Sequence, residues 1–566
     1  MGKSGDLGFV YIPEQPNLRD YEKVCSTFKF SDIHREFSWY KTGKANIAYE
    51  ALDQQVEKGL GDKVALYFES GNRKEQLTFA QMASYSNAFA NVLRKYGIGR
   101  SDRVGIFMPG CPEYYISFMG IVKAGAVAVP LFEAFMEEAV LDRLKDSGAK
   151  AVVVTRELRD RIPADKLREL RHIFVVGGCD NIQKGDIQWH NELYDASDSF
   201  AAAWVGPEDP YLLLYVSGAE GKPKGIIHVH KGMVGLYITG KWVQDLNRDD
   251  VYWCTAKPGW ITGVVYGFLT PWLHGVSAVV REGEFDAEDW YRILTKYRVT
   301  VWYSAPTFFR MLIDSGQEIP DKSELHLRHI MSSREPLTED VLEWSQKYLG
   351  QPIYDTWWMS ETGMNLICNY RCMPVKLGAI GKPLPGIKAA VIDDEGNLLP
   401  PNHIGNLAVK AGWPTMLEGV WNNHQEFYDY FRHYPWFVTG DSAYYDEDGY
   451  FYFQGRIDGI ITTAGERVGP NEVENKLIQH PAVSDAGVVG KPDQLRGEVV
   501  KAYITLNKGY DWTQDLAEDI RDFVAKGLAT HAAPREFETK DAIPKTKRGR
   551  NDRRVLREWV LGLDKK

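Results

Sequence analysis

Short apolar runs alternate with amphipathic segments along much of this chain, and this alternation constrains the fold more than any other feature. Residues 103–108 and 149–155 are typical of buried strands, whereas residues 113–123 have the period of an amphipathic helix. Such alternation favours parallel sheets covered by helices. The pattern returns in apolar runs at residues 212–216, 251–254, 276–280 and 300–303. Because 566 residues are enough for several hydrophobic cores, we expect two helix-covered sheets in sequence.

The helical period fades from about residue 378 to residue 457, where Gly and Pro separate short strands. This spacing indicates a small antiparallel β-barrel or sheet. The tail beyond it returns to mixed α/β patterning. We therefore predict an α/β protein with a large domain over residues 1–457, whose β-rich subdomain spans about 378–457, and a small C-terminal α/β domain over residues 458–566.

Composition excludes several classes of partner. The net charge is −10 and no long basic run occurs, which argues against binding of nucleic acid through phosphate contacts. No run of eighteen apolar residues occurs and the N-terminus lacks the apolar segment of a secretory signal, so we expect no membrane span. The six cysteines show neither zinc spacing nor a disulfide framework, and a cytoplasmic location fits all of these features.

The residues best suited to bind a small molecule lie at 354–363, which read YDTWWMSETG. The paired tryptophans can form the wall of a small apolar pocket. Thr356 and Ser360 can exchange hydrogen bonds with a ligand, and Glu361 can hold a divalent cation. The alternative interpretation is a core strand that ends in a polar turn.

A second candidate is the loop at residues 217–225, SGAEGKPKG, which directly follows the apolar run 212–216. Its glycines let backbone N–H groups approach phosphate oxygens, and its lysines add positive charge. It is not a Walker loop, because the Lys-Ser/Thr pair and the spacing are absent. A surface hairpin is the alternative interpretation.

These two segments, together with six others in the family's order, resemble the adenylate-forming acyl-CoA synthetases, and within them most closely the AMP-forming acetyl-CoA synthetases. The six other motifs are PGWITG at 258–263, EP at 335–336, TGD at 439–441, GRID at 455–458, GERVGP at 465–470 and PKTKRGR at 544–550. In that superfamily the small C-terminal domain is mobile, and the resemblance places its hinge at Asp458.

The resemblance implies a two-step ligase. ATP and acetate, or another short-chain acid, would give an acyl-adenylate and pyrophosphate, and CoA would then give acetyl-CoA and AMP, with Mg²⁺ as the metal. The partners would be these small molecules, with no nucleic acid and no membrane. Two alternatives stay open: an adenylation-impaired relative that binds nucleotide or acyl-CoA, and a ligase for a different small carboxylic acid. Departures from the family pattern motivate them, at Ala219, Glu220, Lys257, Ser333, Arg334 and Arg550.

The resemblance also assigns a nucleotide site. Asp441 matches a carboxylate that binds the ribose hydroxyls, a bidentate task that suits this group. Arg456 and Arg467 match arginines at the ribose and the α-phosphate, although lone arginines are usually solvated. The nucleotide-binding residues expected in this way are Ser217, Gly218, Glu220, Gly221, Glu335, Pro336, Asp355, Thr356, Trp357, Trp358, Met359, Ser360, Asp441, Arg456 and Arg467.

Trp358 matches the residue that closes the acyl tunnel in acetyl-specific relatives, and a Trp side chain buries ~150–250 Å². The expected acyl pocket is formed by Ile261, Thr262, Ser333, Arg334 and Trp358. Ser333 and Arg334 stand where those relatives have Val and Gly, so both changes make the pocket more polar.

The remaining roles implied by the resemblance are catalytic, CoA-binding and metal-binding. The catalytic residues are Arg550, Glu361 and Lys224. Arg550 replaces a lysine that enters the site during adenylation. The exchange is not conservative, because the guanidinium of Arg is a planar fork. Thr262, Ala464 and Gly465 would bind CoA. Glu361 would hold a metal ion, and main-chain carbonyls of Ile478, His480 and Val483 match a second metal site, although a histidine beside Pro481 is usually structural.

Overall fold

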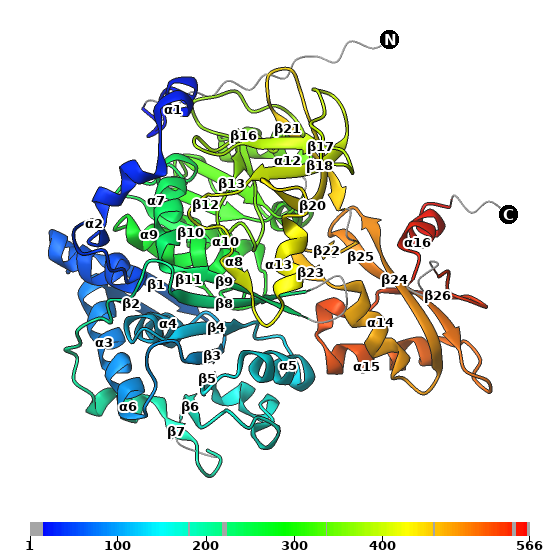
Figure 1. Ribbon diagram of the computed structural model, residues 1–566, viewed down its shortest axis with the longest axis horizontal. Coiled ribbons are helices and arrows are strands. Elements are labelled where there is room, and N and C mark those ends of the chain that lie inside the picture. The colour runs from blue at the N-terminus through cyan, green and yellow to red at the C-terminus, as the bar shows by residue number, and fades with distance from the viewer. Residues whose placement is uncertain are drawn as a thin grey trace.

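The computed structural model of the protein describes residues 15–178, 182–217, 223–335, 337–456, 459–545 and 551–562. Two large sheets dominate the N-terminal part of the chain, and a smaller unit follows them beside β20 and α13 (Figure 1). Among the described residues, no helix has both the length and the apolar character needed to cross a membrane.

The first large sheet has eight strands in the order β19-β9-β8-β4-β3-β5-β6-β7. β3 pairs in parallel with β4 and β5, and β5 pairs in parallel with β6. The strands are β3 (Arg103–Phe107), β4 (Val127–Leu131), β5 (Ala151–Thr155), β6 (His172–Val176), β7 (Ile187–Gln188), β8 (Pro210–Val216), β9 (Lys224–Val229) and β19 (Gly419–Val420). The strands expected at 103–108, 149–155 and 212–216 are confirmed.

The second large sheet has nine strands in the order β16-β15-β14-β13-β12-β10-β11-β1-β2. Its central strands, from β14 to β1, all pair in parallel. The strands are β1 (Val64–Ser70), β2 (Arg73–Thr78), β10 (Val251–Cys254), β11 (Ser277–Arg281), β12 (Val301–Ser304), β13 (His329–Ser333), β14 (Ile353–Trp357), β15 (Ile367–Cys368) and β16 (Lys382–Pro383).

Helices cover both faces of these sheets, because strand side chains alternate between two cores. In β10, Tyr252 and Cys254 face a core shared by both sheets, whereas Trp253 faces an outer core with α10 and α11. The inner helices are α3 (Phe79–Lys95), α4 (Pro112–Lys123), α7 (Met233–Trp242), α8 (Ile261–Val264) and α9 (Thr270–Leu273). The outer helices include α5 (Glu137–Ser147), α10 (Ala287–Lys296), α11 (Pro306–Asp314) and α12 (Glu339–Trp344), and shorter helices are α1 (Tyr21–Thr27), α2 (Trp39–Thr42), α6 (Trp189–Asp195) and α13 (His424–Tyr430).

The β-rich region forms a four-stranded antiparallel sheet in the order β17-β18-β20-β21. Its strands are β17 (Ala389–Ile392), β18 (Gly405–Lys410), β20 (Trp436–Tyr445) and β21 (Phe451–Arg456). The expected barrel is therefore corrected to an open sheet, since β17 and β21 do not pair with each other among the described residues. Closure into a barrel would require the two edge strands, β17 and β21, to pair with each other.

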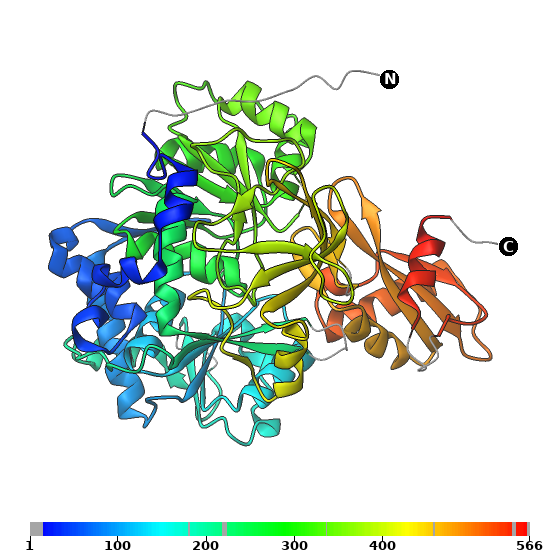
Figure 2. The same ribbon diagram turned by 45° about the horizontal axis from the view of Figure 1, so that its top comes forward.

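The C-terminal unit is a separate α/β domain, as expected, with its own hydrophobic core (Figure 2). Its sheet has the order β23-β22-β25-β24, with β26 paired to β25. The elements are β22 (Ile461–Thr463), β23 (Glu466–Val468), α14 (Pro470–Ile478), β24 (Val483–Asp493), β25 (Gly497–Leu506), α15 (Gln514–Gly527), β26 (Glu536–Thr539) and α16 (Arg553–Val560). The boundary at residues 457 and 458 stays a prediction, because both lie outside the described residues.

Candidate functional site

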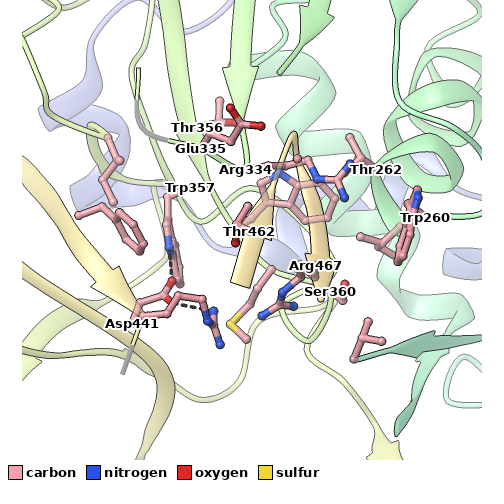
Figure 3. Close-up of a pocket in the computed structure, with 18 of the residues that line it drawn as sticks. Trp260, Thr262, Arg334, Glu335, Thr356, Trp357, Ser360, Asp441, Thr462 and Arg467 are labelled. Atoms are coloured by element: carbon pink, nitrogen blue, oxygen red, sulfur yellow. Dashed lines mark hydrogen bonds and ion pairs between the residues drawn. The ribbon is translucent and has the colours of Figure 1, made fainter. Parts of the chain in front are cut away.

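A cavity of about 110 Å³ lies where β13, β14, β20 and β21 meet the hairpin of β22 and β23 (Figure 3). Most of the expected site residues line it: Ile261, Thr262, Arg334, Glu335, Asp355, Thr356, Trp357, Trp358, Met359, Ser360, Asp441, Arg456, Gly465 and Arg467. Sequence reasoning missed Val216, Trp260, Ile380, Phe453 and Thr462, which also line the cavity. Most of these side chains are apolar, so their residue types carried no chemical signal.

Asp441 is held on one wall of the cavity by two side chains. Trp357 Nε1 donates to Asp441 Oδ2 at 2.8 Å, and Arg456 Nη1 lies 2.6 Å from Oδ1 (Figure 3). Asp441 and Arg456 are direct partners across the antiparallel pair β20–β21, so the sheet register brings them together. The arrangement presents a buried, oriented carboxylate to any polar ligand in the cavity.

Trp358 is fixed by a second group of aromatic side chains. Its Nε1 donates to the Tyr303 hydroxyl at 3.1 Å, and that hydroxyl lies 2.8 Å from Thr356 Oγ1. The Tyr266 ring packs perpendicular to the indole at 5.0 Å between centroids. Tyr303 and Tyr266 are fully buried, so the indole that lines the cavity has a rigid support. In the sequence, the one feature that indicates a role for Tyr303 is its hydroxyl near the end of the apolar strand β12.

Glu361 lies buried behind the cavity wall and is surrounded by cations. Tyr430 donates to its Oε1 at 2.7 Å, Lys224 Nζ is 3.3 Å away, and Arg467 Nη1 is 3.6 Å from Oε2. Burial acts to raise the pKa of Glu361, but Lys224, Arg467 and the hydrogen bond from Tyr430 lower it to about 2. The carboxylate is therefore charged at every physiological pH.

A second cavity of about 160 Å³ adjoins the first through Met359, Arg456 and Arg467. Ser217, Lys224 and Arg432 also line it, so its wall combines several cationic groups with a hydroxyl. Glu426 and Asp429 are the acidic members of the same wall. A polyanion in this cavity would meet more positive than negative charge.

The hairpin of β22 and β23 brings Gly465, one of the expected CoA residues, to the first cavity. Ala464 and Gly465 form its turn with φ values of 48° and 78°, and a Cβ on Gly465 would lie 3.4 Å from Glu335 Oε1. Gly465 lines the cavity opposite Thr262, whereas Ala464 does not. Ser333 lies buried in β13 without lining the cavity.

Family models match two parts of the chain: the AMP-binding enzyme model covers residues 52–421, and the AMP-binding enzyme C-terminal domain model covers residues 472–550. The chain belongs to the AMP-binding enzyme family. It is 51% identical to an acetyl-coenzyme A synthetase of Bacillus subtilis over 97% of this chain and 96% of that protein. It is 35% identical to an acetyl-coenzyme A synthetase of Methanothrix soehngenii, over 96% of this chain and 85% of that protein.

Two solved structures have a similar fold. An acyl-CoA synthetase of Brucella canis superposes with a TM-score of 0.72 at 30% identity, covering 96% of this chain and 100% of that one. An anthranilate CoA ligase in complex with anthranoyl-AMP superposes with a TM-score of 0.70 at 28% identity, covering 95% of this chain and 99% of that one. The resemblance inferred from the sequence motifs and the α/β fold class with a separate C-terminal domain are thereby confirmed.

In this AMP-binding enzyme, we expect the ionisation of Asp355 to make the free energy of unfolding depend on pH. Burial raises the pKa of Asp355 to about 7, although Ser332 Oγ and the Thr356 N–H both donate to its Oδ1. An exposed Asp titrates near 3.9, so between about pH 4 and 7 the folded state binds more protons than the unfolded state. We expect the free energy of unfolding to fall as pH rises through this window, by about 4 kcal/mol at most.

Denaturant unfolding at pH 5 and pH 8 measures this slope. The variant Asp355→Asn keeps an acceptor for both hydrogen bonds and cannot ionise, so its loss of stability over that interval should be smaller than in the wild-type protein. Equal losses in the two proteins would contradict the assignment to Asp355.

The second expected metal site of the family lies between the last residue of α14, Ile478, and the first residue of β24, Val483. His480 Nδ1 accepts the N–H of Ala482 at 3.2 Å, and its Nε2 lies 3.2 Å from Asp519. The His480 carbonyl already accepts the N–H of Val483, and Ile478 is exposed. Within the described part of the chain, no three or more His, Cys, Asp or Glu side chains gather as metal ligands, so a site here would rest on carbonyls and stays a prediction.

Several expected site residues cannot be placed. Those that lie outside the described residues are Gly218, Ala219, Glu220, Gly221, Pro336, Asp458 and Arg550. Their roles stay predictions.

Proposed function

We propose that this protein is an acetate–CoA ligase that forms acetyl-CoA, AMP and pyrophosphate from acetate, ATP and CoA through an acetyl-adenylate. The similarity to acetyl-coenzyme A synthetases along nearly the whole chain supports the reaction. The observation that carries the proposal is that most of the described residues expected to bind the nucleotide and the acyl group line one cavity.

In the first step, a carboxylate oxygen of acetate attacks the α-phosphorus of ATP and pyrophosphate leaves. Asp441 would accept hydrogen bonds from the ribose hydroxyls, because Trp357 and Arg456 orient its carboxylate towards the cavity. The adenine would lie beside Glu335 and Asp355. The polyphosphate would extend into the second, cationic cavity, with Ser217 and Lys224 on its wall.

Catalysis of this step would be largely positioning and electrostatic stabilisation, since negative charge gathers around the α-phosphate. Lys224 and Arg467 are held at defined distances by the Glu361 carboxylate between them. Glu361 Oε2 is buried and accepts no hydrogen bond from the described residues, and a carboxylate oxygen of this kind fits a Mg²⁺ ligand. Bound Mg²⁺ would neutralise part of the polyphosphate charge.

The acid is selected by the wall that Trp358 forms with Ile261 and Thr262. The supported indole of Trp358 cannot step aside easily, so a two-carbon acid fits best. Arg334 lines the same cavity and makes it more polar than an all-apolar pocket.

In the second step, the thiol of CoA attacks the carbonyl carbon of the mixed anhydride and AMP leaves. Thr262, Ala464 and Gly465 would guide the thiol, and the position of the hairpin at the cavity supports this role. We place the hinge for movement of the C-terminal domain at Asp458, with rigid units over residues 1–457 and 458–566. Scattering with and without ligands tests that movement.

Arg550 is the departure that bears most directly on the first step. We expect Arg550→Lys to raise acetate-dependent adenylation several-fold, because an ammonium is more compact than a guanidinium fork. Thioester formation from preformed acetyl-adenylate should change little. Both rates are measured by rapid quench, with Lys545→Arg as a control in the same segment. Slower adenylation in Arg550→Lys would show that Arg550 is adapted to its own site and would weigh against the adenylation-impaired alternative.

Product analysis tests the overall reaction. Purified protein is incubated with ATP, CoA, Mg²⁺ and one acid at a time from acetate to hexanoate, and acyl-CoA, AMP and pyrophosphate are quantified. Acetate should give the highest kcat/KM, with equal amounts of the three products. A higher value for another acid would favour the second alternative, and no product with any acid would favour the binding protein.

A further inference from the structure

Arg334 has a backbone conformation that its residue type disfavours. It directly follows β13 and has a φ of 82°, in the left-handed region that suits glycine. Non-glycine residues persist there only where their surroundings determine the conformation, and such residues gather at functional sites. The position of the Arg334 side chain is therefore a guide to its role.

The guanidinium of Arg334 extends from the large domain to the hairpin of the C-terminal domain. Its Nη2 lies 3.8 Å from Oε2 of Glu466, the first residue of β23. It also lies over the Trp260 ring at 5.9 Å from the centroid. Both partners of the ion pair are about four-fifths buried, so water screens the pair less than a surface pair.

Glu466 closes the turn that carries Gly465. It pairs with Thr463 across the hairpin, and Ala464 N–H donates to the Arg496 carbonyl at 2.9 Å. A charge that holds the Glu466 side chain therefore acts directly beside Gly465, which lines the cavity. Among the described residues, Glu466 Oε2 has no hydrogen-bond partner, and the cation that lies beside this oxygen is Arg334.

The surroundings of Glu466 would repel its carboxylate without Arg334. Burial raises the pKa of Glu466 to about 7; Arg334 and Lys257 oppose this shift, whereas Glu133 and Glu335 add to it. Lys257 is itself paired with Glu282 and lies 3.6 Å from Glu133. Arg334 is thus the main positive charge that compensates the buried Glu466 carboxylate at this contact.

On the basis of the proposed function, we infer that Arg334 is a positioning residue which holds Glu466, and with it the Gly465 turn, at the cavity for the thioester-forming step. We expect the adenylation step to depend less on the ion pair, because among the described residues Glu466 forms an ion pair with Arg334 and with no residue assigned to ATP, and the Glu335 carboxylate acts on it only through charge repulsion. Arg310 supports the same contact from its other side, where Nε donates to the Leu495 carbonyl at 2.9 Å and Nη2 lies 2.6 Å from Glu335.

Charge reversal on the hairpin tests the inference. Glu466→Arg should lower the rate of acetyl-CoA formation from preformed acetyl-adenylate about tenfold, because it places two cations together. Acetate-dependent pyrophosphate exchange, measured without CoA, should stay within about twofold of wild type. Asp511→Arg makes the same charge change at an exposed position of the same domain and should leave both rates unaltered.

Rescue distinguishes the ion pair from a general effect on folding. Adding Arg334→Glu to Glu466→Arg restores opposite charges and should recover most of the thioester rate, giving a non-additive double-mutant cycle. The inference is overturned if the double variant is no faster than Glu466→Arg, or if Glu466→Arg slows both half-reactions equally. These outcomes differ from a failure of the proposed function, in which wild-type protein itself would show no acetate-dependent pyrophosphate exchange.

Discussion

Replacement of Trp358 by glycine is expected to shift the preferred acid from acetate to acids of four to six carbons. Trp358 lines the cavity and is supported by Tyr303 and Tyr266, so its removal opens an apolar slot that neighbouring side chains do not fill. Each methylene buried in that slot contributes ~0.8 kcal/mol, or roughly fourfold in kcat/KM. The ratio of kcat/KM for hexanoate to kcat/KM for acetate should therefore be about two orders of magnitude higher in Trp358→Gly than in wild type.

The measurement is kcat/KM across acids from acetate to hexanoate in wild type and Trp358→Gly. Trp357→Phe is the matched control: it changes the adjacent tryptophan and loses the hydrogen bond to Asp441, so it should raise the KM for ATP and leave the acid preference alone. An unaltered chain-length profile in Trp358→Gly would show that another residue closes the pocket.

Glu361→Gln is expected to lower the rate of adenylation about 10²–10³-fold, a loss similar to removal of a preorganised electrostatic group. The substitution keeps the shape of the side chain but removes the negative charge between Lys224 and Arg467, and it removes the carboxylate proposed for Mg²⁺. Single-turnover formation of acetyl-adenylate measures the effect without the CoA step.

Glu426→Gln provides the control for that experiment. Glu426 also lies 3.2 Å from Lys224 but is more exposed, so its loss should change the rate by less than about threefold. If Glu361→Gln and Glu426→Gln have equal small effects, Glu361 does not organise the phosphate site.

Several strands of the two large sheets could be predicted because they are short apolar runs, whereas the polar edge strand β2 (RKEQLT) gave no such signal. β3, β5, β8 and β10 all lie where the sequence indicated. The strand content of the β-rich region was predicted. Whether its two edge strands pair with each other depends on long-range contacts, so the sequence could not distinguish the open sheet β17-β18-β20-β21 from a barrel.

The site was predictable to the extent that its residues fall in motifs. Tyr430 was missed because its partner Glu361 is 69 positions away, and nothing local in either segment indicates the contact. Arg334 was expected to make the acyl pocket more polar, and no partner for its charge was indicated within the described residues. The structure instead gives it Glu466, a partner that only the docking of the C-terminal domain brings near.

The central claim is that the cavity activates acetate as an adenylate, and isotope exchange between pyrophosphate and ATP tests it most directly. Wild-type protein with ATP, Mg²⁺ and labelled pyrophosphate, without CoA, should incorporate label into ATP only when acetate is added, and the incorporation should saturate with acetate. Absence of acetate-dependent exchange, in protein that binds ATP, would contradict the account.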